Sequence, residues 1–420
     1  MRPEKKTPAH KTGDFAELVC SNSFRGAALN NAVGVLKEEL KLLDSLIMNA
    51  ALHAEVPAGG ALAVDRKAFS DFIEDTIKKN PLVEVIYSEA EEIPEFSKDN
   101  PVIIATGPLT SESLTDSIQK LTGTENLAFF DAISPIVTYD SLNLDLIFRQ
   151  SRYDKGGDDY LNIALNEEQY IEFITEVDNA EKYSGNHDVE NDSLDKLRPF
   201  EGCMPIEDMI SRGPETLRYG PFKPKGLTDK RTGISPHAVL QLRQDDKEGF
   251  LWSMVGMQTR MKRHEQIRIF KSLPGLEDAE FVRYGTVHRN TFIESPKCLN
   301  STLDFKDHSG LFFAGQITGV EGYVESTSSG LVAGINAARM VLEQDLVEFP
   351  EDTAIGSLMA YISDEERKGF QPMNVSFGLF KNYQDTKYYN GRRLKRRDRR
   401  IRAAKQALNI IEGFKDSNIN

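Results

Sequence analysis

Two of the three cysteines stand in sequence settings that favour a reactive thiolate. Cys203 lies in the segment RPFEGCMPIE, where Pro205 is a favoured first residue of a helix. The dipole of that helix and a nearby arginine would lower the thiol pKa below its ordinary value of about 8.5. Cys20 precedes Ser21-Asn22-Ser23, which predicts a second helix cap. Most lone cysteines are inert core residues, so spacing alone leaves both open between a nucleophile and a structural thiol.

Glycines gather around the predicted end of one apolar strand and the start of the helix after it. Exposed backbone N–H groups at a helix start, together with the helix dipole, suit a pyrophosphate or the edge of a flavin ring. We place that helix start in the small-residue segment 326–334. Tight packing of strand against helix is the alternative. The glycines are Gly315, Gly319, Gly322, Gly330 and Gly334, and Gly107 ends a similar apolar run. We expect the turns at Gly107 and Gly315 to lie near each other at the carboxyl edge of one sheet.

His288 lies in RYGTVHRNTF, between two arginines in a predicted loop beside a strand. A structural histidine is the default interpretation of that pattern. The other six histidines show no metal-ligand spacing, so the sequence predicts no metal site.

A basic cluster stands near the C-terminus of a chain whose formal net charge is −14. That net charge argues against nucleic-acid binding over the whole surface but allows a local basic site. Both a solvated helix and a phosphate-binding patch fit the cluster. Only Asp398 opposes its cations, which are Arg392, Arg393, Lys395, Arg396, Arg397, Arg399, Arg400 and Arg402.

Length and composition describe a soluble chain of two or three structural units. The chain has 420 residues, of which 40% are hydrophobic and 28% charged, which excludes a mainly disordered protein. No run approaches the ~18 apolar residues of a membrane span, and the N-terminal residues lack the apolar stretch of a signal peptide. We therefore expect a cytoplasmic protein without membrane contact. Three widely spaced cysteines, including Cys298, exclude a disulfide framework.

Hydrophobic periodicity indicates the elements that position these residues. An acidic, Asn- and Gly-rich stretch at 176–198 predicts an exposed loop, and the tail from 346 is predicted to be helical. The other predicted elements are helices from Ser21 to about His53 and over Arg66–Lys79, a strand at 83–87, buried strands at 102–105 and 310–315, and antiparallel strands at 237–242 and 250–255.

Several long motifs closely resemble the folate- and FAD-dependent tRNA (uracil-5-)-methyltransferases. They include VIIATGPLTS, RPFEGCMPIEDMISRGPETLRYGPFKPKGL, EFVRYGTVHRNTFIESP and FFAGQITGVEGYVESTSSGLVAGINAAR, and the resemblance spans nearly the whole chain. It implies an α/β fold with an FAD-dependent oxidoreductase-like, Rossmann-type sheet and an inserted α/β domain. The FAD-binding domain would comprise residues 1–108 and 298–345, the inserted folate and RNA domain 109–297, and a basic helical tail 346–420.

One expected feature of this family is absent from the sequence. Family members open with a strand and a GxGxxG turn that holds the FAD pyrophosphate, followed by a second strand. Gly13 and Gly26 cannot replace that turn, because they are too far apart and follow no apolar strand. We therefore expect the first βαβ unit to be missing and FAD to be held poorly.

The resemblance also implies a reaction on tRNA. Carbon 5 of uracil is a weak nucleophile until a thiolate adds to carbon 6. The methyl carbon would come from 5,10-methylenetetrahydrofolate, with reduced FAD as reductant and NAD(P)H recharging the FAD, and the T-loop uridine would become 5-methyluridine. Cys203 is assigned as the thiolate and Cys20 to a supporting role near the flavin, with exchanged roles as the alternative.

The remaining site residues follow from the same resemblance. His288, with Arg289 and Asn290, would contact folate. A flavin-free remnant that only binds RNA and an enzyme acting on an rRNA uridine remain alternatives, and the oligomeric state stays open. The residues expected to bind FAD are Gly107, Gly315, Gln316, Gly319, Gly322, Gly330 and Gly334, and those expected to bind RNA phosphates are Arg396, Arg397, Arg399 and Arg400.

Overall fold

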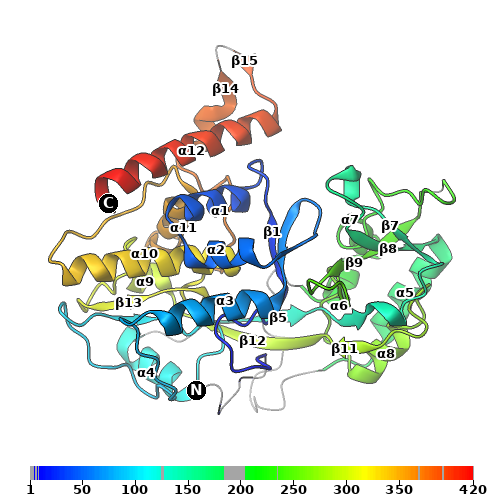
Figure 1. The fold of residues 1–420 in the computed structure, drawn as a ribbon, viewed down its shortest axis with the longest axis horizontal. Helices are drawn as coiled ribbons and strands as arrows, with labels where there is room; N and C mark the ends of the chain where they lie inside the picture. The colour runs from blue at the N-terminus through cyan, green and yellow to red at the C-terminus, as the bar shows by residue number, and fades with distance from the viewer. Residues whose placement is uncertain are drawn as a thin grey trace.

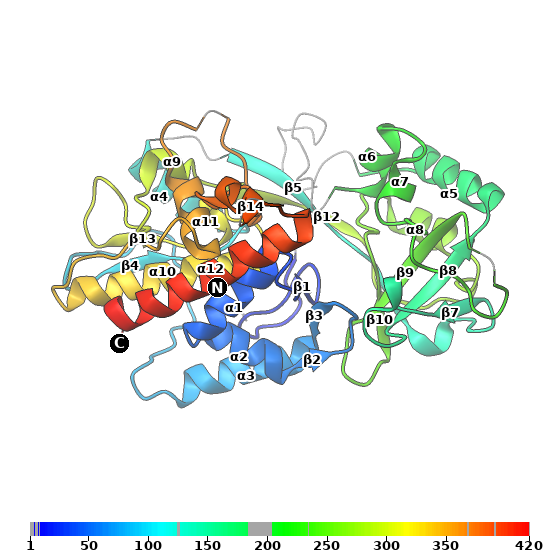
Figure 2. The ribbon, with the colours of Figure 1, turned by 90° about the horizontal axis from the view of Figure 1, so that it is seen from above.

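Two hydrophobic cores organise the chain, and a long two-stranded ribbon runs between them (Figure 1, Figure 2). The first core draws its buried side chains from Leu18–Ile118 and from Phe292–Ile411, and the second from Val137–Ala279. The middle of the chain is therefore inserted into the first unit. The computed structural model describes residues 4, 7, 9–123, 127–183, 204–233, 235–367, 369–389 and 392–419, with the side chains of 127–133, 287–289 and 384 left out of that description.

The first unit contains long helices and small sheets. Helix α10 contacts the strand pair β4 and β13, and α1, α10 and α11 contact one another (Figure 2). Its elements are β1 (Ser23–Gly26), α1 (Ala32–Leu42), α2 (Leu46–His53), β2 (Glu55–Val56), β3 (Ala61–Val64), α3 (Arg66–Lys79), β4 (Val102–Ile104), α4 (Glu112–Thr122), α9 (Ser295–Cys298), β13 (Leu311–Phe313), η5 (Gln316–Thr318), α10 (Tyr323–Val341), α11 (Ala354–Ser363), η6 (Tyr383–Lys387), β14 (Tyr388–Tyr389), β15 (Arg392–Arg393) and α12 (Arg396–Asn418).

Strands β4 and β13 form the parallel pair that the two apolar runs predict. Ile104 lies opposite Phe313, and the Ala314 N–H donates to the Ile104 carbonyl at 2.9 Å. Parallel strands end at the same edge of a sheet, where ligands of α/β folds commonly bind. The predicted placement of the turns at Gly107 and Gly315 on one sheet is therefore confirmed.

The second unit is built on a six-stranded antiparallel sheet in the order β11-β6-β10-β9-β8-β7. The antiparallel strands predicted near 240 and 252 are confirmed, and Ser253 lies opposite Arg243. Helices α5, α6 and α8 add apolar side chains to its core. The elements are β6 (Ile136–Thr138), η1 (Tyr139–Ser141), β7 (Ile147–Arg149), η2 (Arg152–Asp154), β8 (Tyr160–Leu165), α5 (Glu167–Asn179), α6 (Ile206–Ser211), α7 (Thr216–Tyr219), β9 (Ala238–Gln244), β10 (Leu251–Met254), α8 (Arg263–Phe270) and β11 (Phe281–Arg283).

The ribbon pairs β5 (Leu127–Ile133) with β12 (Thr286–Phe292) along the full length of both strands. The segment around His288, predicted as a loop, is therefore a strand. Its Thr, Val and Phe residues favour extended backbone, and β5 supplies the partner that local sequence does not reveal.

The predicted single helix from Ser21 to about His53 is wrong at its start and in its middle. Residues 23–26 form β1, which pairs with β3. The helix is then interrupted at Asp44, whose φ is 55°, and α2 starts afresh with the Ser45 side chain accepting from the Met48 N–H at 3.4 Å. The end at His53 and the helix Arg66–Lys79 are confirmed.

Two further expectations are wrong, one about Cys20 and one about the segment 83–87. Cys20 precedes a strand rather than a helix N-terminus, so no helix dipole acts on it from that side. The predicted strand at 83–87 is absent, because this exposed segment pairs with no other strand among the described residues.

Helix α12 packs on the first core, against α1 (Figure 1). Ala404, Ala407 and Ile411 are buried on its inner face, while Arg396 and Arg397 are exposed. Only the outer face of this basic helix is therefore solvated. Neither α12 nor any other helix in the described ranges combines the length and hydropathy needed to cross a membrane.

A buried carboxyl joins α1 to the N-terminus of α11. The Glu39 carboxyl accepts hydrogen bonds from the Ala354 and Ile355 N–H groups at 2.7 and 2.9 Å, which have no carbonyl partner within α11. Burial raises the pKa of Glu39 from 4.5 to about 8, although both hydrogen bonds oppose this shift. The folded protein therefore binds this proton more tightly than the unfolded chain does.

We predict that Glu39 makes the protein less stable as the pH rises from about 5 to 8. A carboxyl with a raised folded-state pKa stabilises fully below its unfolded pKa and loses that contribution as the pH approaches the folded value. Glu39→Gln should remove this part of the pH dependence of the free energy of unfolding, which amounts to up to a few kcal/mol. Urea unfolding of wild type and variant at pH 5.5 and 8 measures it, with Glu38→Gln on the half-exposed neighbouring position, where the carboxylate pairs with Lys41, as the control. Parallel pH profiles for wild type and Glu39→Gln would contradict the prediction.

Candidate functional site

A cavity of about 410 Å³ lies where the two units meet. Both units supply its walls, and so does the ribbon between them. The lining includes Cys20, Arg25 and Arg66 before the insertion, Arg243, Ser253 and Gln258 within it, Asn290 on the ribbon, and Gln316, Gly322, Tyr323 and Asn374 after it.

Four side chains hold the backbone segment that carries Cys20. The Cys20 N–H donates to Tyr323 Oη at 2.9 Å. Arg66 and Arg283 donate to the carbonyls of the two residues before Cys20. Arg243 donates to the side chains of the two residues after it, at 2.8 and 3.1 Å. Because these four residues come from both units, the segment is held only when the units are packed together.

Positive charge from half-buried arginines dominates this part of the cavity. Asp245 accepts from Arg66 at 2.8 and 3.3 Å and raises the pKa of Arg66 although burial opposes it. Burial lowers the pKa of Arg243 and of Arg283, and repulsion from Arg66 adds to both shifts. Asp245 is the carboxylate that pairs with this group, and Glu321 also lines the cavity, so positive charge still exceeds negative charge around the Cys20 segment, which suits a ligand carrying negative charge.

The N-terminus of α10 opens into the same cavity. Gly322 precedes the helix with a φ of 109°, and Tyr323 and Val324 line the cavity. The N–H groups of a first helical turn lack carbonyl partners within the helix and add positive potential here, while the buried Glu325 carboxylate of that turn pairs with Arg25. Burial raises the pKa of Tyr323, so its phenol stays neutral while its oxygen accepts from the Cys20 segment.

Three of the seven residues predicted to bind the cofactor lie at the cavity. Gln316 and Gly322 line it. Gly107, with a φ of 71°, directly precedes Pro108, which also lines it. The sheet edge predicted from the two strand ends is therefore one side of this site.

The other four predicted glycines have different surroundings. The Gly315 N–H donates to a serine hydroxyl of α10 at 2.8 Å, and the Gly319 N–H donates to a backbone carbonyl at 3.0 Å. A Cβ on Gly319 would lie 2.4 Å from the Phe370 ring, so packing requires glycine there. Gly330 and Gly334 lie inside α10, where N–H groups bond to the preceding turn. The expected helix start at 326–334 is therefore wrong, because the helix begins at Tyr323.

The residues predicted to contact folate lie on β12. Asn290 is 2% exposed and lines the cavity, and its Nδ2 atom has no hydrogen-bond partner in the described structure. The backbones of His288 and Arg289 pair with β5, and their side chains lie outside the described part of the chain. Asn290 thus offers an unused buried donor to a ligand.

Cys203 itself lies outside the described residues, which resume at Met204. Pro205 caps α6, and the Ile206 N–H donates to the carbonyl of Gln258, a residue of the cavity wall, at 2.8 Å. The helix predicted after Cys203 is therefore present and starts beside the cavity. The nucleophilic role of Cys203 stays a prediction.

The four arginines predicted to bind RNA phosphates differ in their contacts. Arg399 donates to the Tyr383 carbonyl at 2.7 Å and lies 3.8 Å from the centroid of the Tyr383 ring. Arg400 donates to a backbone carbonyl near α1 at 3.3 Å. These two fasten α12 to the first unit, whereas Arg396 and Arg397 extend into solvent.

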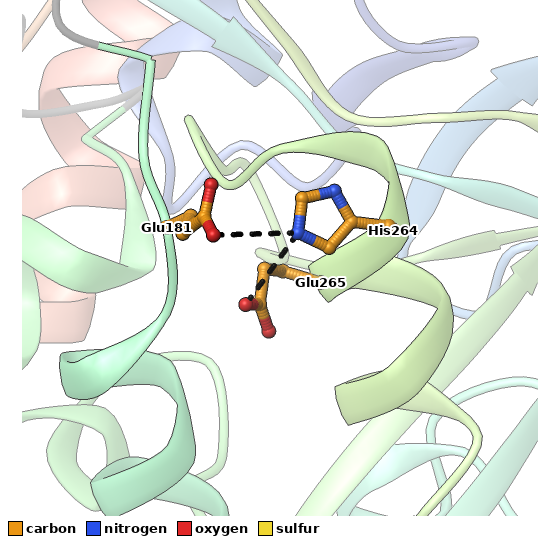
Figure 3. Close-up of side chains that lie close together, drawn as sticks. All are labelled: Glu181, His264 and Glu265. Atoms are coloured by element: carbon orange, nitrogen blue, oxygen red, sulfur yellow. Dashed lines mark ion pairs between the residues drawn. The ribbon is translucent and has the colours of Figure 1, made fainter.

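Glu181, His264 and Glu265 form a group of three potential metal ligands on the second unit (Figure 3). The two carboxylates lie 4.0 and 3.7 Å from His264 Nε2. Each carboxylate also pairs with a protein cation, Lys262 at 2.7 Å and Arg268 at 2.7 Å. Because these cations already neutralise the carboxylates, the group is a surface ion-pair network.

Sequence reasoning missed most of the residues around Cys20. Arg66, Arg243 and Tyr323 are far apart in the chain and show no spacing that links them. Tyr323 directly follows Gly322, and Arg66 ends the motif VPAGGALAVDR, so both lay within recognisable segments. Arg243 lies in an ordinary alternating strand pattern, which does not indicate a contact with the Cys20 segment.

The fold resembles two crystal structures of Aquifex aeolicus GidA. Their TM-scores are 0.64 and 0.63 at 16% identity, and the matches cover 94% of this chain and 69% and 67% of those chains. The predicted α/β fold with a Rossmann-type sheet and an inserted domain is confirmed. Similarity at this level of identity concerns the fold alone.

Sequence comparisons are more specific. Residues 6–345 match the family described as "Glucose inhibited division protein A". A Natranaerobius thermophilus protein named "Methylenetetrahydrofolate--tRNA-(uracil-5-)-methyltransferase TrmFO" is 51% identical over 99% of this chain and 92% of its own length. Proteins of the same name from Desulforamulus reducens and Listeria monocytogenes are 53% identical over 98% of this chain and over 90% and 91% of their own lengths. The chain therefore belongs to the family of methylenetetrahydrofolate-dependent tRNA (uracil-5-)-methyltransferases, TrmFO.

Proposed function

We propose that this protein transfers a one-carbon unit from 5,10-methylenetetrahydrofolate to carbon 5 of the T-loop uridine of tRNA, forming 5-methyluridine. The observation that carries the proposal is the cavity between the two units. There the Cys20 segment, Arg66, Arg243 and the N-terminus of α10 surround one space that suits an anionic planar ligand. Family membership supplies the substrate class.

The residues present fit the flavin ring of FAD. Gln316, Gly322 and Tyr323 would hold it at the N-terminus of α10, where the N–H groups of the first turn lack carbonyl partners within the helix. When bound, reduced FAD supplies the hydride that converts the transferred methylene into a methyl group. Cys20 would lie beside this ring, since Tyr323 contacts its backbone. We further propose that NADH or NADPH supplies the electrons, in the cytoplasm.

Cys203 is proposed as the nucleophile for uracil. Its thiolate would add to carbon 6, which makes carbon 5 an enolate carbon able to attack the folate methylene. Loss of the carbon 5 proton then expels tetrahydrofolate and leaves an exocyclic methylene on carbon 5. Hydride addition to that methylene forms the methyl group and expels the thiolate from carbon 6, so the cysteine is regenerated. A helix start bonded to the cavity wall just after Cys203 supports this role.

Folate is proposed to contact β12. Asn290 reaches the cavity from the ribbon, and His288 and Arg289 are its neighbours on the same strand. RNA phosphates are proposed to contact Arg396 and Arg397. These two are exposed, whereas Arg399 and Arg400 are engaged within the protein.

We predict that Cys203 forms the covalent bond to uracil. Cys203→Ser should lower turnover by several orders of magnitude and leave folding intact, because serine is nearly isosteric but a poor nucleophile. Peptide mass spectrometry after trapping with tRNA containing 5-fluorouracil should find the adduct on Cys203. The buried Cys298→Ala is the control. An adduct on Cys20, or full activity of Cys203→Ser, would reverse the assignment.

We predict that Arg243 positions the Cys20 segment. Arg243→Gln removes charge-assisted bonds to the two residues after Cys20, and turnover should fall about 10- to 100-fold. Initial rates and thermal unfolding of the flavin-loaded protein measure the effect. Arg231→Gln, which breaks a surface ion pair in the same unit, is the matched control. Equal rates for the two variants would rule out this role.

We predict that Arg396 and Arg397 bind RNA phosphates. Replacing both with Gln should weaken tRNA binding and reduce the magnitude of the slope of log K against log salt by about 1.5, since two phosphate contacts are lost. Titrations with tRNA at several salt concentrations measure the slope. Arg399→Gln should instead destabilise the packing of α12, because its guanidinium binds the Tyr383 carbonyl. An unchanged slope in the double variant would assign both arginines to a solvated face.

A further inference from the structure

A small ribbon projects from the first unit beside the start of α12 (Figure 1). It consists of β14 and β15, in which Tyr388 lies opposite Arg393 and Tyr389 lies opposite Arg392. All four residues are exposed, the two tyrosines by 56% and 54%. An isolated two-stranded ribbon is marginally stable in water. The side chains of these two tyrosines belong to neither hydrophobic core, so a contribution to core packing does not account for their presence here.

Contacts at the base of the ribbon orient it. The Leu394 N–H donates to the Lys387 carbonyl at 3.0 Å, which continues the pairing toward α12. From α12, the Arg402 guanidinium lies 4.3 Å from the centroid of the Tyr389 ring. Successive strand residues face opposite sides, so Tyr389 is on the side of α12, whereas Tyr388 and Arg393 face away from it. The ring of Tyr388 is therefore presented to solvent on a braced support.

The surroundings of the ribbon are strongly cationic. Between residues 386 and 405 the only acidic residue is Asp398, in a chain with a net charge of −14. An aromatic ring among cations is the arrangement that binds single-stranded nucleic acid, because bases stack on the ring while cations hold the phosphates. The exposed cations nearest in sequence are Lys387, Arg392, Arg393, Lys395, Arg396 and Arg397.

We propose that this ribbon binds an unpaired nucleotide of the RNA substrate, with its base stacked on Tyr388 and the adjacent phosphate on Arg393, which shares that face of the ribbon. The proposal rests on the proposed function, which makes tRNA the substrate. It adds that binding needs a base free of duplex stacking, because both faces of a paired base are covered within a helix. Tyr389, held by Arg402, is a positioning residue for the ribbon.

A tryptophan in place of Tyr388 reports stacking directly. The only tryptophan of the chain, Trp252, is 1% exposed and lies in the second unit. A single-stranded RNA oligonucleotide should therefore quench the emission of the introduced indole in Tyr388→Trp. Duplex RNA of the same length should leave that emission unchanged. Equal quenching by the two RNAs would overturn the requirement for an unpaired base.

Binding titrations separate stacking from charge. Tyr388→Ala should weaken binding of the single strand and of tRNA by about 5- to 100-fold without changing the salt slope, because no phosphate contact is lost. Tyr388→Phe should bind as wild type does, and Tyr388→Leu should resemble Tyr388→Ala. Tyr219→Ala, at an exposed tyrosine of the second unit, is the matched control.

The outcomes distinguish this proposal from the proposed function. Wild-type affinity for both RNAs in Tyr388→Ala overturns the ribbon proposal and leaves the methyltransferase proposal standing. Loss of RNA binding in Tyr388→Ala, with no 5-methyluridine formed by the wild type, supports the ribbon and contradicts the proposed function. Binding to anionic lipid vesicles that depends on Tyr388, without RNA binding, would assign the ribbon to a membrane surface and overturn the proposal.

Discussion

The packing of three half-buried arginines around the Cys20 segment is the interaction on which the site depends. Arg66 comes from the first unit, and Arg243 and Arg283 come from the second. Removing a guanidinium group from water is costly unless its N–H groups and charge are matched. Here backbone carbonyls, two polar side chains and Asp245 supply those partners, so the two units must stay in register for the charges to remain partly buried.

This constraint explains why the cavity has its particular chemistry. The α10 N-terminus, Arg66 and Arg243 give the cavity positive character from two directions, and the Nδ2 of Asn290, without a partner in the described structure, adds a donor from the ribbon. An anionic planar ligand would replace the solvent that such groups require. The ends of β4 and β13 bring Gly107 and Gly315 to the same edge, which is where α/β folds commonly bind cofactors.

Charge is arranged differently at the outer surface. Around α12, Arg399 and Arg400 are used internally, and the exposed cations gather at its first turn and on the adjacent ribbon. Half-buried arginines thus act within the cavity and in helix packing, while exposed ones remain available to a polyanion. Because the chain is negatively charged overall, this cationic surface is the favoured place for a polyanion among the described residues.

The local pattern of apolar and polar residues was sufficient to predict elements whose periodicity is visible within a few residues. The amphipathic helix at Arg66–Lys79, the buried strands ending near Gly107 and Gly315, and the antiparallel strands near Arg243 and Trp252 were all predictable, because periodicity reports which faces are buried. Long motifs identified the family. The strand at Ser23–Gly26 was not predictable, since its extended backbone depends on pairing with β3, a partner almost forty residues away.

The sequence by itself determined the fold class, the family and the two cysteines worth testing, because these depend on local chemistry and motif identity. Only the tertiary structure decided what surrounds Cys20. The helix dipole predicted there is absent, and arginines from distant elements take its place. It also decided which arginines of the basic cluster are free, because guanidinium groups with the same local sequence differ only in what packs beside them. Contacts between residues far apart in the chain leave no periodic pattern in the sequence, so only the tertiary structure shows them.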